Sequence, residues 1–126
     1  MIDEFAPDEP DAKAVLADVV GIEKLLQRLA KKGRAVSYSE ILLMLGFRFS
    51  RPKMRALCRT MDEVDRRAAA RGEPELAALV VRESDKLPGQ GWWIGRTDYK
   101  GQWTGPDARA FLDQIQQHTF DYWRKN

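Results

Sequence analysis

The sequence predicts a mainly helical α+β domain with a three-helix core, a two-stranded β-hairpin and a long C-terminal helix. Three observations predict this fold. Apolar residues recur at three- and four-residue spacing in three segments before residue 72, and again after residue 104. Serine or threonine start signals and glycine stop signals separate these segments. Between residues 75 and 94, short apolar runs are bounded by proline and glycine, as is typical of strands joined by a tight turn.

Length and composition indicate one soluble globular domain. The chain has 126 residues, of which 44% are hydrophobic and 32% are charged. Residues 1–10 are acidic and interrupted by prolines, so we expect a flexible acidic arm followed by a single domain over residues 11–126. The arm lacks the basic region followed by an apolar region that a secretory signal requires. No apolar run in the sequence reaches the roughly 20 residues that are needed to cross a bilayer. One cysteine, Cys58, predicts a reducing, cytoplasmic setting.

The first two helices have clear local signals. Apolar residues at helical spacing predict one long amphipathic helix from Asp11 to about residue 32, with Gly33 as its stop. A brief strand is expected at residues 35–36. Ser37 and Glu40 then match a capping box for a helix over residues 38–45, which ends at Gly46. This second helix is so apolar that we expect it to be largely buried.

The third helix is the basic one. Ser50 and Pro52 predict its start, and Gly72 predicts its end after about residue 71. Between Arg48 and Gly72 there are eight Lys or Arg residues and three acidic ones, although the net charge of the whole chain is only +2. Its apolar stripe comprises Met54, Leu57, Cys58, Met61, Val64 and Ala68.

The remaining elements follow in order. Residues 75–83 contain the run LAALVV, which predicts a strand, and the turn residues of 85–91 lead to a return strand at 92–94. A loop over residues 98–104 precedes the last helix, which begins after Thr104 and continues to about residue 125.

This order of elements resembles winged helix-turn-helix domains. SYSEILLMLGF with the basic helix behind it looks like the helix-turn-helix, and ALVVRESDKLPGQGWW looks like strand, wing loop and strand. The second stretch, with the Tyr-Trp pair near the C-terminus, is similar to small uncharacterised bacterial proteins of the winged-helix type. The resemblance implies nucleic-acid binding, although folds do not fix functions.

The basic helix is the first candidate site. Arginine can pair with phosphate or with guanine in the major groove, and helix-turn-helix proteins present the N-terminal end of their second helix to the bases. The candidate DNA contacts here are Arg48, Arg51, Lys53, Arg55 and Arg59. The alternative is a solvated or protein-binding face, in which Asp62, Glu63 and Asp65 pair locally with Arg59, Arg66 or Arg67.

The predicted wing and the tryptophans are further candidates. Arg82 and Lys86, with Gln90 and Arg96 nearby, could touch the DNA backbone, although Pro88 and the glycines are also explained by turn geometry alone. Trp92, Trp93 and Trp103 could stack on bases, but core packing is the favoured use because tryptophan is usually buried. Alternation along a strand predicts that only one residue of the Trp92–Trp93 pair lies in the core.

The last helix carries an apolar face, and two packing partners for this face are considered. It packs either within the chain, over the first helix, or against a second copy as a two-fold interface, and we favour the first. The residues concerned are Phe111, Ile115, Tyr122 and Trp123.

The sequence does not predict an enzyme, a metal site or a cofactor. His118 has no second ligand at metal-binding spacing, Cys58 lies on an apolar stripe, and no phosphate-binding or dinucleotide motif is present. The leading hypothesis is a cytoplasmic transcriptional regulator or DNA-associated accessory factor that binds duplex DNA. The alternative is a protein-interaction module on the same frame, without nucleic-acid binding.

Overall fold

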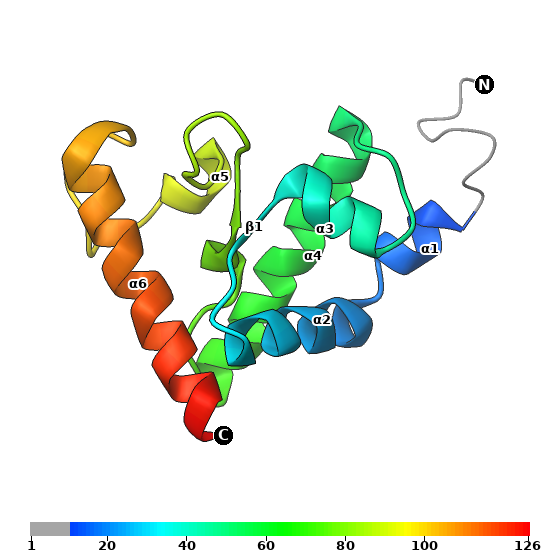
Figure 1. Ribbon diagram of the computed structural model, residues 1–126, viewed down its shortest axis with the longest axis horizontal. Helices are drawn as coiled ribbons and strands as arrows, with labels where there is room; N and C mark the ends of the chain where they lie inside the picture. Colours follow the sequence, from blue (N-terminus) through cyan, green and yellow to red (C-terminus); the bar gives the residue numbers. More distant parts are fainter. Residues whose placement is uncertain (1–10) are drawn as a thin grey trace.

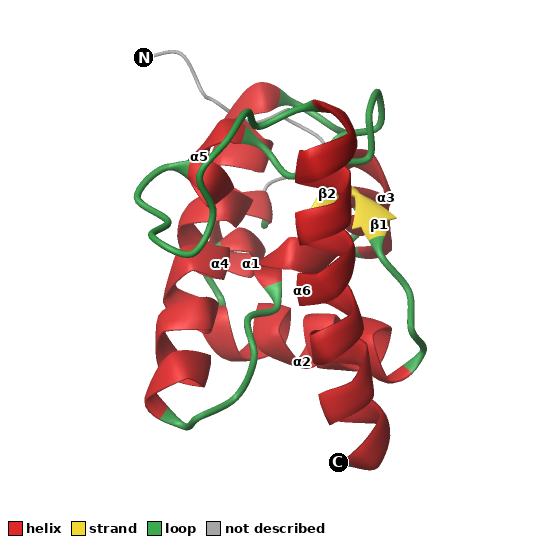
Figure 2. Ribbon diagram, turned by 90° about the vertical axis from the view of Figure 1, so that its left-hand side faces the viewer, coloured by secondary structure: helices red, strands yellow, loops and turns green. Residues whose placement is uncertain are grey.

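The computed structural model describes residues 11–126, which form a mainly helical α+β structure with one small sheet (Figures 1 and 2). The mainly helical α+β fold class is therefore confirmed. The arm expected at residues 1–10 lies outside the described residues. The elements are α1 (Ala12–Leu16), α2 (Val19–Lys31), β1 (Val36–Ser37), α3 (Tyr38–Met44), α4 (Arg51–Ala70), the 3-10 turn η1 (Ala77–Leu79), β2 (Val80–Val81), α5 (Gln90–Trp93) and α6 (Gly105–Lys125).

The long first helix predicted from periodicity is divided in two. Asp18 leaves the helical conformation and caps α2, because its Oδ1 accepts a hydrogen bond from the Gly21 N–H at 3.1 Å. Aspartate favours such capping over the helix interior because its short side chain competes for backbone N–H groups. The end of α1 is in turn held by α4, where Thr60 Oγ1 donates to the Leu16 carbonyl.

The short helix α3 begins as predicted. The Glu40 N–H donates to Ser37 Oγ at 3.1 Å, and the Ser37 N–H donates to Glu40 Oε1 at 3.0 Å, which confirms the capping box. The expectation that this helix is largely buried is only half correct. Ile41 and Leu42 are fully buried, whereas Leu43 and Met44 are 64% and 40% exposed.

Helix α4 begins and ends where its signals predicted. Ser50 Oγ accepts the Lys53 N–H at 3.3 Å, Pro52 lies in the first turn, and Gly72 follows the helix at a φ of 74°. The buried residues of its predicted apolar stripe are Leu57, Met61, Val64 and Ala68. This stripe packs on α1 and α2, so α4 forms the helical core together with these two helices (Figure 1).

The predicted β-hairpin is wrong in its return strand and in its pairing, although the end of its first strand is present as β2. Within residues 11–126 the sheet has two strands, and β2 pairs in parallel with β1 through Val36–Val80 and Ser37–Val81. Half of the LAALVV run forms η1, and residues 90–93 form the helical turn α5. Tertiary contacts favour the helical turn at residues 90–93, because the Trp93 side chain is buried and its Nε1 donates to the Pro88 carbonyl at 3.2 Å.

Helix α6 runs along one side of the molecule and packs on α2 and η1 (Figure 2). Its C-terminal part joins the main core through Trp123, which is 8% exposed. Its N-terminal part covers a second, smaller cluster of buried residues, comprising Ala78, Val81, Leu87, Trp93, Ala108 and Leu112. The segment after η1, including α5, is therefore held between α4 and α6.

Candidate functional site

The first half of α4 carries a row of exposed arginines, here called the arginine row: Arg51, Arg55 and Arg59. The four-residue spacing places all three on one side of the helix. Within residues 11–126, none of the three forms an ion pair. Arg48, just before the helix, is also exposed.

Arginines elsewhere in the described structure are mostly paired with acids. In the second half of α4, Arg66 and Arg67 both bind Glu63, and these hydrogen bonds lower the pKa of Glu63 to about 2. The predicted local pairing of Glu63 is therefore confirmed. Like charges four residues apart destabilise a helix by a few tenths of a kcal/mol, about 0.2–0.5 per pair. The arginine row therefore does not serve helix stability, and its arrangement is suited to binding an anion.

Lys53 differs from the other predicted DNA contacts. Its side chain is 2% exposed, and it lies four residues before the buried Leu57, on the buried side of α4. A buried lysine does not present its charge to a phosphate in solution. We therefore leave Lys53 out of the basic face.

Arg82 and Lys86 do not lie on a wing. They belong to the loop between β2 and α5, where Arg82 Nη2 lies 3.0 Å from Asp85 Oδ2 and Lys86 Nζ lies 3.0 Å from Glu83 Oε1. Each cation therefore has an acidic neighbour within three residues. The loop is further fastened to α6, since Arg109 Nη2 donates to the Lys86 carbonyl at 3.0 Å.

A groove lies beside the arginine row, between α4 and the segment of residues 89–96. It has a volume of about 880 Å³. Arg55 and Arg59 line it from α4, and Trp92 lines it from α5. Its other lining residues include Tyr38, Met54, Cys58, Met61, Asp62, Asp65, Glu75 and Arg82.

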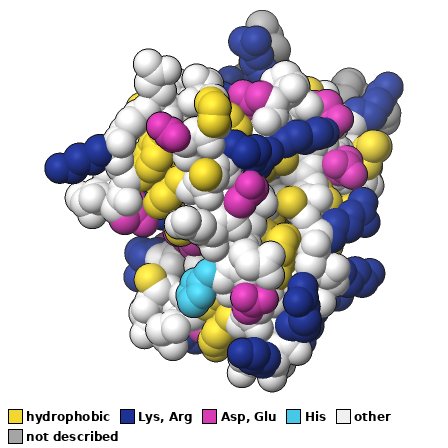
Figure 3. Space-filling model, turned by 60° about the vertical axis from the view of Figure 1, so that its left-hand side comes forward, with side chains coloured by type: hydrophobic (Ala, Val, Ile, Leu, Met, Phe, Trp, Pro, Cys, Tyr) yellow, Lys and Arg dark blue, Asp and Glu magenta, His cyan; other side chains and the backbone are white. Residues whose placement is uncertain are grey.

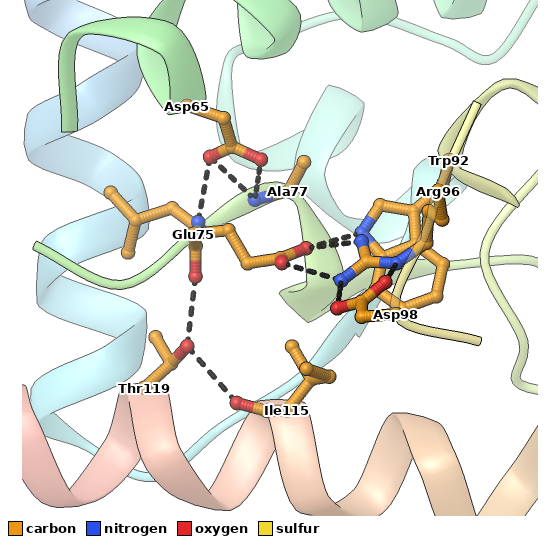
Figure 4. A network of polar contacts seen from close by, with 9 residues as sticks. Asp65, Glu75, Ala77, Trp92, Arg96, Asp98, Ile115 and Thr119 are labelled. Atoms are coloured by element: carbon orange, nitrogen blue, oxygen red, sulfur yellow. Dashed lines mark hydrogen bonds and ion pairs between the residues drawn. The ribbon is translucent and has the colours of Figure 1, made fainter. Parts of the chain in front are cut away.

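One wall of the groove is a network of polar contacts centred on Arg96 (Figure 4). Arg96 Nη1 and Nη2 donate to the two carboxylate oxygens of Glu75 at 3.0 and 2.9 Å, and Nε donates to Asp98 at 3.0 Å. The Trp92 Nε1 also donates to Glu75, at 2.7 Å. Thr119 of α6 holds the Glu75 backbone through a hydrogen bond of 2.8 Å to its carbonyl. Glu75 is thus held at its carboxylate by Arg96 and Trp92 and at its backbone carbonyl by Thr119.

The pKa of Arg96 reflects this network. Partial burial opposes the charged guanidinium, but hydrogen bonds to Glu75 and Asp98 outweigh burial and raise the pKa. Sequence reasoning considered Arg96 only as a cation of the wing. Its partner Glu75 lies 21 residues away, so no local spacing could have indicated the pair.

Burial shifts the ionisable groups at the floor of the groove. It raises the pKa of Asp65 to about 7, against the opposing effect of hydrogen bonds from the Leu76 and Ala77 backbone N–H groups. Burial also raises the pKa of Tyr38 to about 12, and its hydroxyl accepts the Gly89 N–H at 3.1 Å. The Cys58 thiol has a raised pKa for the same reason, so it is not an activated thiolate.

The apolar residues of the last helix are used within the chain. Trp123 belongs to the main core and Tyr122 packs against it, whereas Phe111 and Ile115 pack against the second cluster. This is the intramolecular reading favoured from the sequence. Of the tryptophan pair, Trp93 lies in the core and Trp92 is partly exposed, which confirms the expectation that only one would be buried.

The face shown in Figure 3 carries His118, coloured cyan, with acidic, basic and apolar side chains mixed around it. Over the part of the chain that the structure describes, no three His, Cys, Asp or Glu side chains gather closely enough to hold a metal ion. No helix of the described residues has both the length and the apolar character to cross a membrane. Neither a family model, nor a curated protein, nor a solved structure matches the chain.

Proposed function

We propose that this protein binds duplex DNA through the exposed side of α4, as a cytoplasmic transcriptional regulator or DNA-associated accessory factor. The observation that carries the proposal is the arginine row. Three guanidiniums with four-residue spacing face solvent, and none forms an ion pair within residues 11–126. Guanidinium groups bind phosphate and guanine through paired hydrogen bonds.

The position of the row supports this assignment. Arg51 to Arg59 spans about 12 Å along the helix axis, at the N-terminal end that helix-turn-helix proteins direct to the bases. Helix α3 precedes α4 and packs on it, as the first helix of such a motif does. Arg48 lies just before the start of α4 and is exposed.

The proposal depends on the helix and not on a wing. The three-helix order of α2, α3 and α4, with β1 between the first two, agrees with the helical part of a winged helix. The loop between β2 and α5 replaces the hairpin, and its cations Arg82 and Lys86 are paired with acids. We therefore assign the main phosphate contacts to Arg51, Arg55 and Arg59.

Fluorescence anisotropy with a mixed pool of labelled duplexes, titrated at several salt concentrations, tests the proposal. Removing one cation that binds a phosphate lowers the slope of log K against log salt by about 0.9. We expect R51Q/R55Q to lower the slope by about 1.8 and to weaken binding at low salt. The charge-matched control on the same helix is R66Q/R67Q, whose arginines are paired with Glu63. Equal effects of the two double variants would show only a general charge effect and would refute the site.

A further variant tests whether the buried Lys53 contributes to DNA binding in addition to the arginine row. K53M removes one positive charge from α4, but at 2% exposure this charge does not reach the DNA. We expect the salt slope of a folded K53M protein to equal that of the wild type. A decrease of about 0.9 in slope would return Lys53 to the interface.

The second candidate function is a protein-interaction module. It is favoured by the exposed apolar side chains of Leu43, Met44 and Phe49, which lie at the end of α3 and in the link to α4. Binding through such a surface weakens little with salt, unlike binding to phosphate. An absence of duplex binding at low salt would favour this candidate, and L43S/F49S would then abolish partner binding.

A further inference from the structure

We infer that the groove between α4 and residues 89–96 is a binding site for a small organic anion with a flat apolar body. The first argument is size and shape. Small-molecule sites in proteins are clefts of about 300–1,000 Å³, and this groove has a volume of about 880 Å³. Such sites combine apolar side chains with convergent polar groups, and the lining of this groove holds both, with more charged side chains than most.

The apolar surface suits a flat ligand. Met54, Met61 and Cys58 line the groove from α4, and the indole of Trp92 lines it from the opposite side. Methionine adapts its shape to a ligand, and the indole, which Arg96 already covers on one face, adds aromatic contact area. The indole is already fixed, because its Nε1 is bound to Glu75 and the Arg96 guanidinium lies 4.1 Å from its ring centroid. A ligand therefore meets a preorganised wall, which lowers the entropic cost of binding.

The charges select an anion at one end. Arg55 and Arg59 line the groove and form no ion pair with a described residue, whereas Arg82 is held by Asp85 and Arg96 by Glu75. A carboxylate, sulfonate or phosphate group of the ligand is therefore expected beside Arg55 and Arg59.

The other end of the groove has the opposite character. Asp62 and Asp65 line it one or two turns further along α4, and Arg55 and Asp65 are about 15 Å apart along the helix axis. Burial raises the pKa of both carboxyl groups, that of Asp65 to about 7. This end suits the apolar body or a hydrogen-bond donor of the ligand, and a second anionic group would be repelled. The groove thus orients an amphipathic anion along α4.

The site has a consequence that depends on the proposed function. Arg55 and Arg59 belong both to the groove and to the arginine row, so a bound anion would neutralise cations that DNA requires. The ligand would then compete with DNA. The site itself does not depend on DNA binding and is tested without it.

The test uses two dyes with the same aromatic body. 8-Anilino-1-naphthalenesulfonate carries a sulfonate, and N-phenyl-1-naphthylamine lacks it. In fluorescence titrations of the full chain, we expect one sulfonated dye molecule per chain with a Kd of about 10–100 µM, an ordinary affinity for a ligand of this size. R55Q/R59Q should weaken the sulfonated dye about tenfold and the neutral dye less than about twofold. The control R66Q/R67Q, outside the groove, should leave both affinities unchanged.

The location of the dye is determined by two-dimensional ¹H–¹⁵N NMR. Signals of the Cys58, Gly89 and Gly91 amides and of the Trp92 indole N–H should shift on saturation, while the Leu43 and Arg124 amides, which lie outside the groove, should not. Failure of the sulfonated dye to bind, shifts outside the groove, or equal effects of R55Q/R59Q on both dyes would each overturn the inference. The dye titrations and the NMR experiment contain no DNA. They can therefore be interpreted even if the protein does not bind DNA.

Discussion

The guanidinium of Arg96 lies 4.1 Å from the centroid of the Trp92 ring, and both side chains bind the same carboxylate of Glu75. This arrangement joins the segment around α5 to the chain before η1. The Arg96 side chain is only 14% exposed, so its contacts are sheltered from water. Planar stacking together with a two-pronged ion pair is specific to arginine among the cationic side chains. Arg96 therefore makes contacts in the wall of the groove that a lysine could not replace.

The first prediction concerns the replacement of that residue by lysine. R96K keeps the charge but loses the second hydrogen bond to Glu75 and the stacking on Trp92. We expect a decrease of about 1–3 kcal/mol in the free energy of unfolding, measured by urea denaturation. The matched control is R124K, because Arg124 is exposed and lies 3.9 Å from Asp121. If R96K were as stable as R124K, the network would not hold the wall.

The second prediction concerns the pH dependence of stability through Asp65. Its pKa is raised from 3.8 to about 7 in the folded protein. The folded state therefore keeps a proton that the unfolded state loses. The stabilisation is complete below about pH 3.8 and is lost as the pH rises through about 7. D65N removes this titration and keeps an oxygen that can accept from the Leu76 and Ala77 N–H groups. We expect D65N to gain stability relative to the wild type between pH 4 and pH 8.

The measurement is the unfolding free energy of both proteins across that pH range. The difference should change by an amount on the order of 1–4 kcal/mol, since one unit of pKa shift corresponds to about 1.4 kcal/mol. D65A serves as the comparison, because it leaves the two N–H groups without an acceptor and should be destabilised at every pH. A difference between D65N and wild type that is independent of pH would contradict the raised pKa.

The helices that were predicted correctly have signals that act locally. Ser37 and Ser50 cap their own first turns, and Gly72 terminates α4 through its own backbone conformation. Such effects are complete within one turn of the chain, so the sequence reports them directly. The mainly helical fold class followed from these signals and from the apolar spacing.

The elements that were missed depend on distant partners. Val80 and Val81 form a strand inside the predicted run, but they pair in parallel with β1, more than 40 residues earlier, and not with residues 92–94. Trp93 lies in a helical turn because the α6 side of the core buries it. The arginine row was predictable from spacing along one helix. The groove was not, since Glu75, Arg96 and Asp65 meet only in the folded chain.

The third prediction concerns the attachment of α1 to α4. Thr60 is buried, and its hydroxyl donates to the Leu16 carbonyl at the end of α1. T60V keeps the shape but leaves this carbonyl without its partner, which should cost about 1–3 kcal/mol of stability. The control T104V lies at an exposed position with no capping hydrogen bond and should change stability by less than about 0.5 kcal/mol. Hydrogen exchange should show faster exchange of α1 amides in T60V, and unchanged exchange would contradict the attachment.

The fourth prediction compares two glycines that face open space. A Cβ on Gly72 or on Gly91 would have no atom within 4 Å, so steric overlap does not distinguish them. Gly72 has a φ of 74°, in the left-handed region where a Cβ is unfavourable, whereas Gly91 lies in the helical turn α5. G72A should therefore lose about 1–2 kcal/mol of stability. G91A should be neutral or gain up to about 1 kcal/mol, because alanine restricts the unfolded chain. Thermal unfolding of both variants measures the contrast, and a G72A protein as stable as G91A would show that α4 does not end in this conformation.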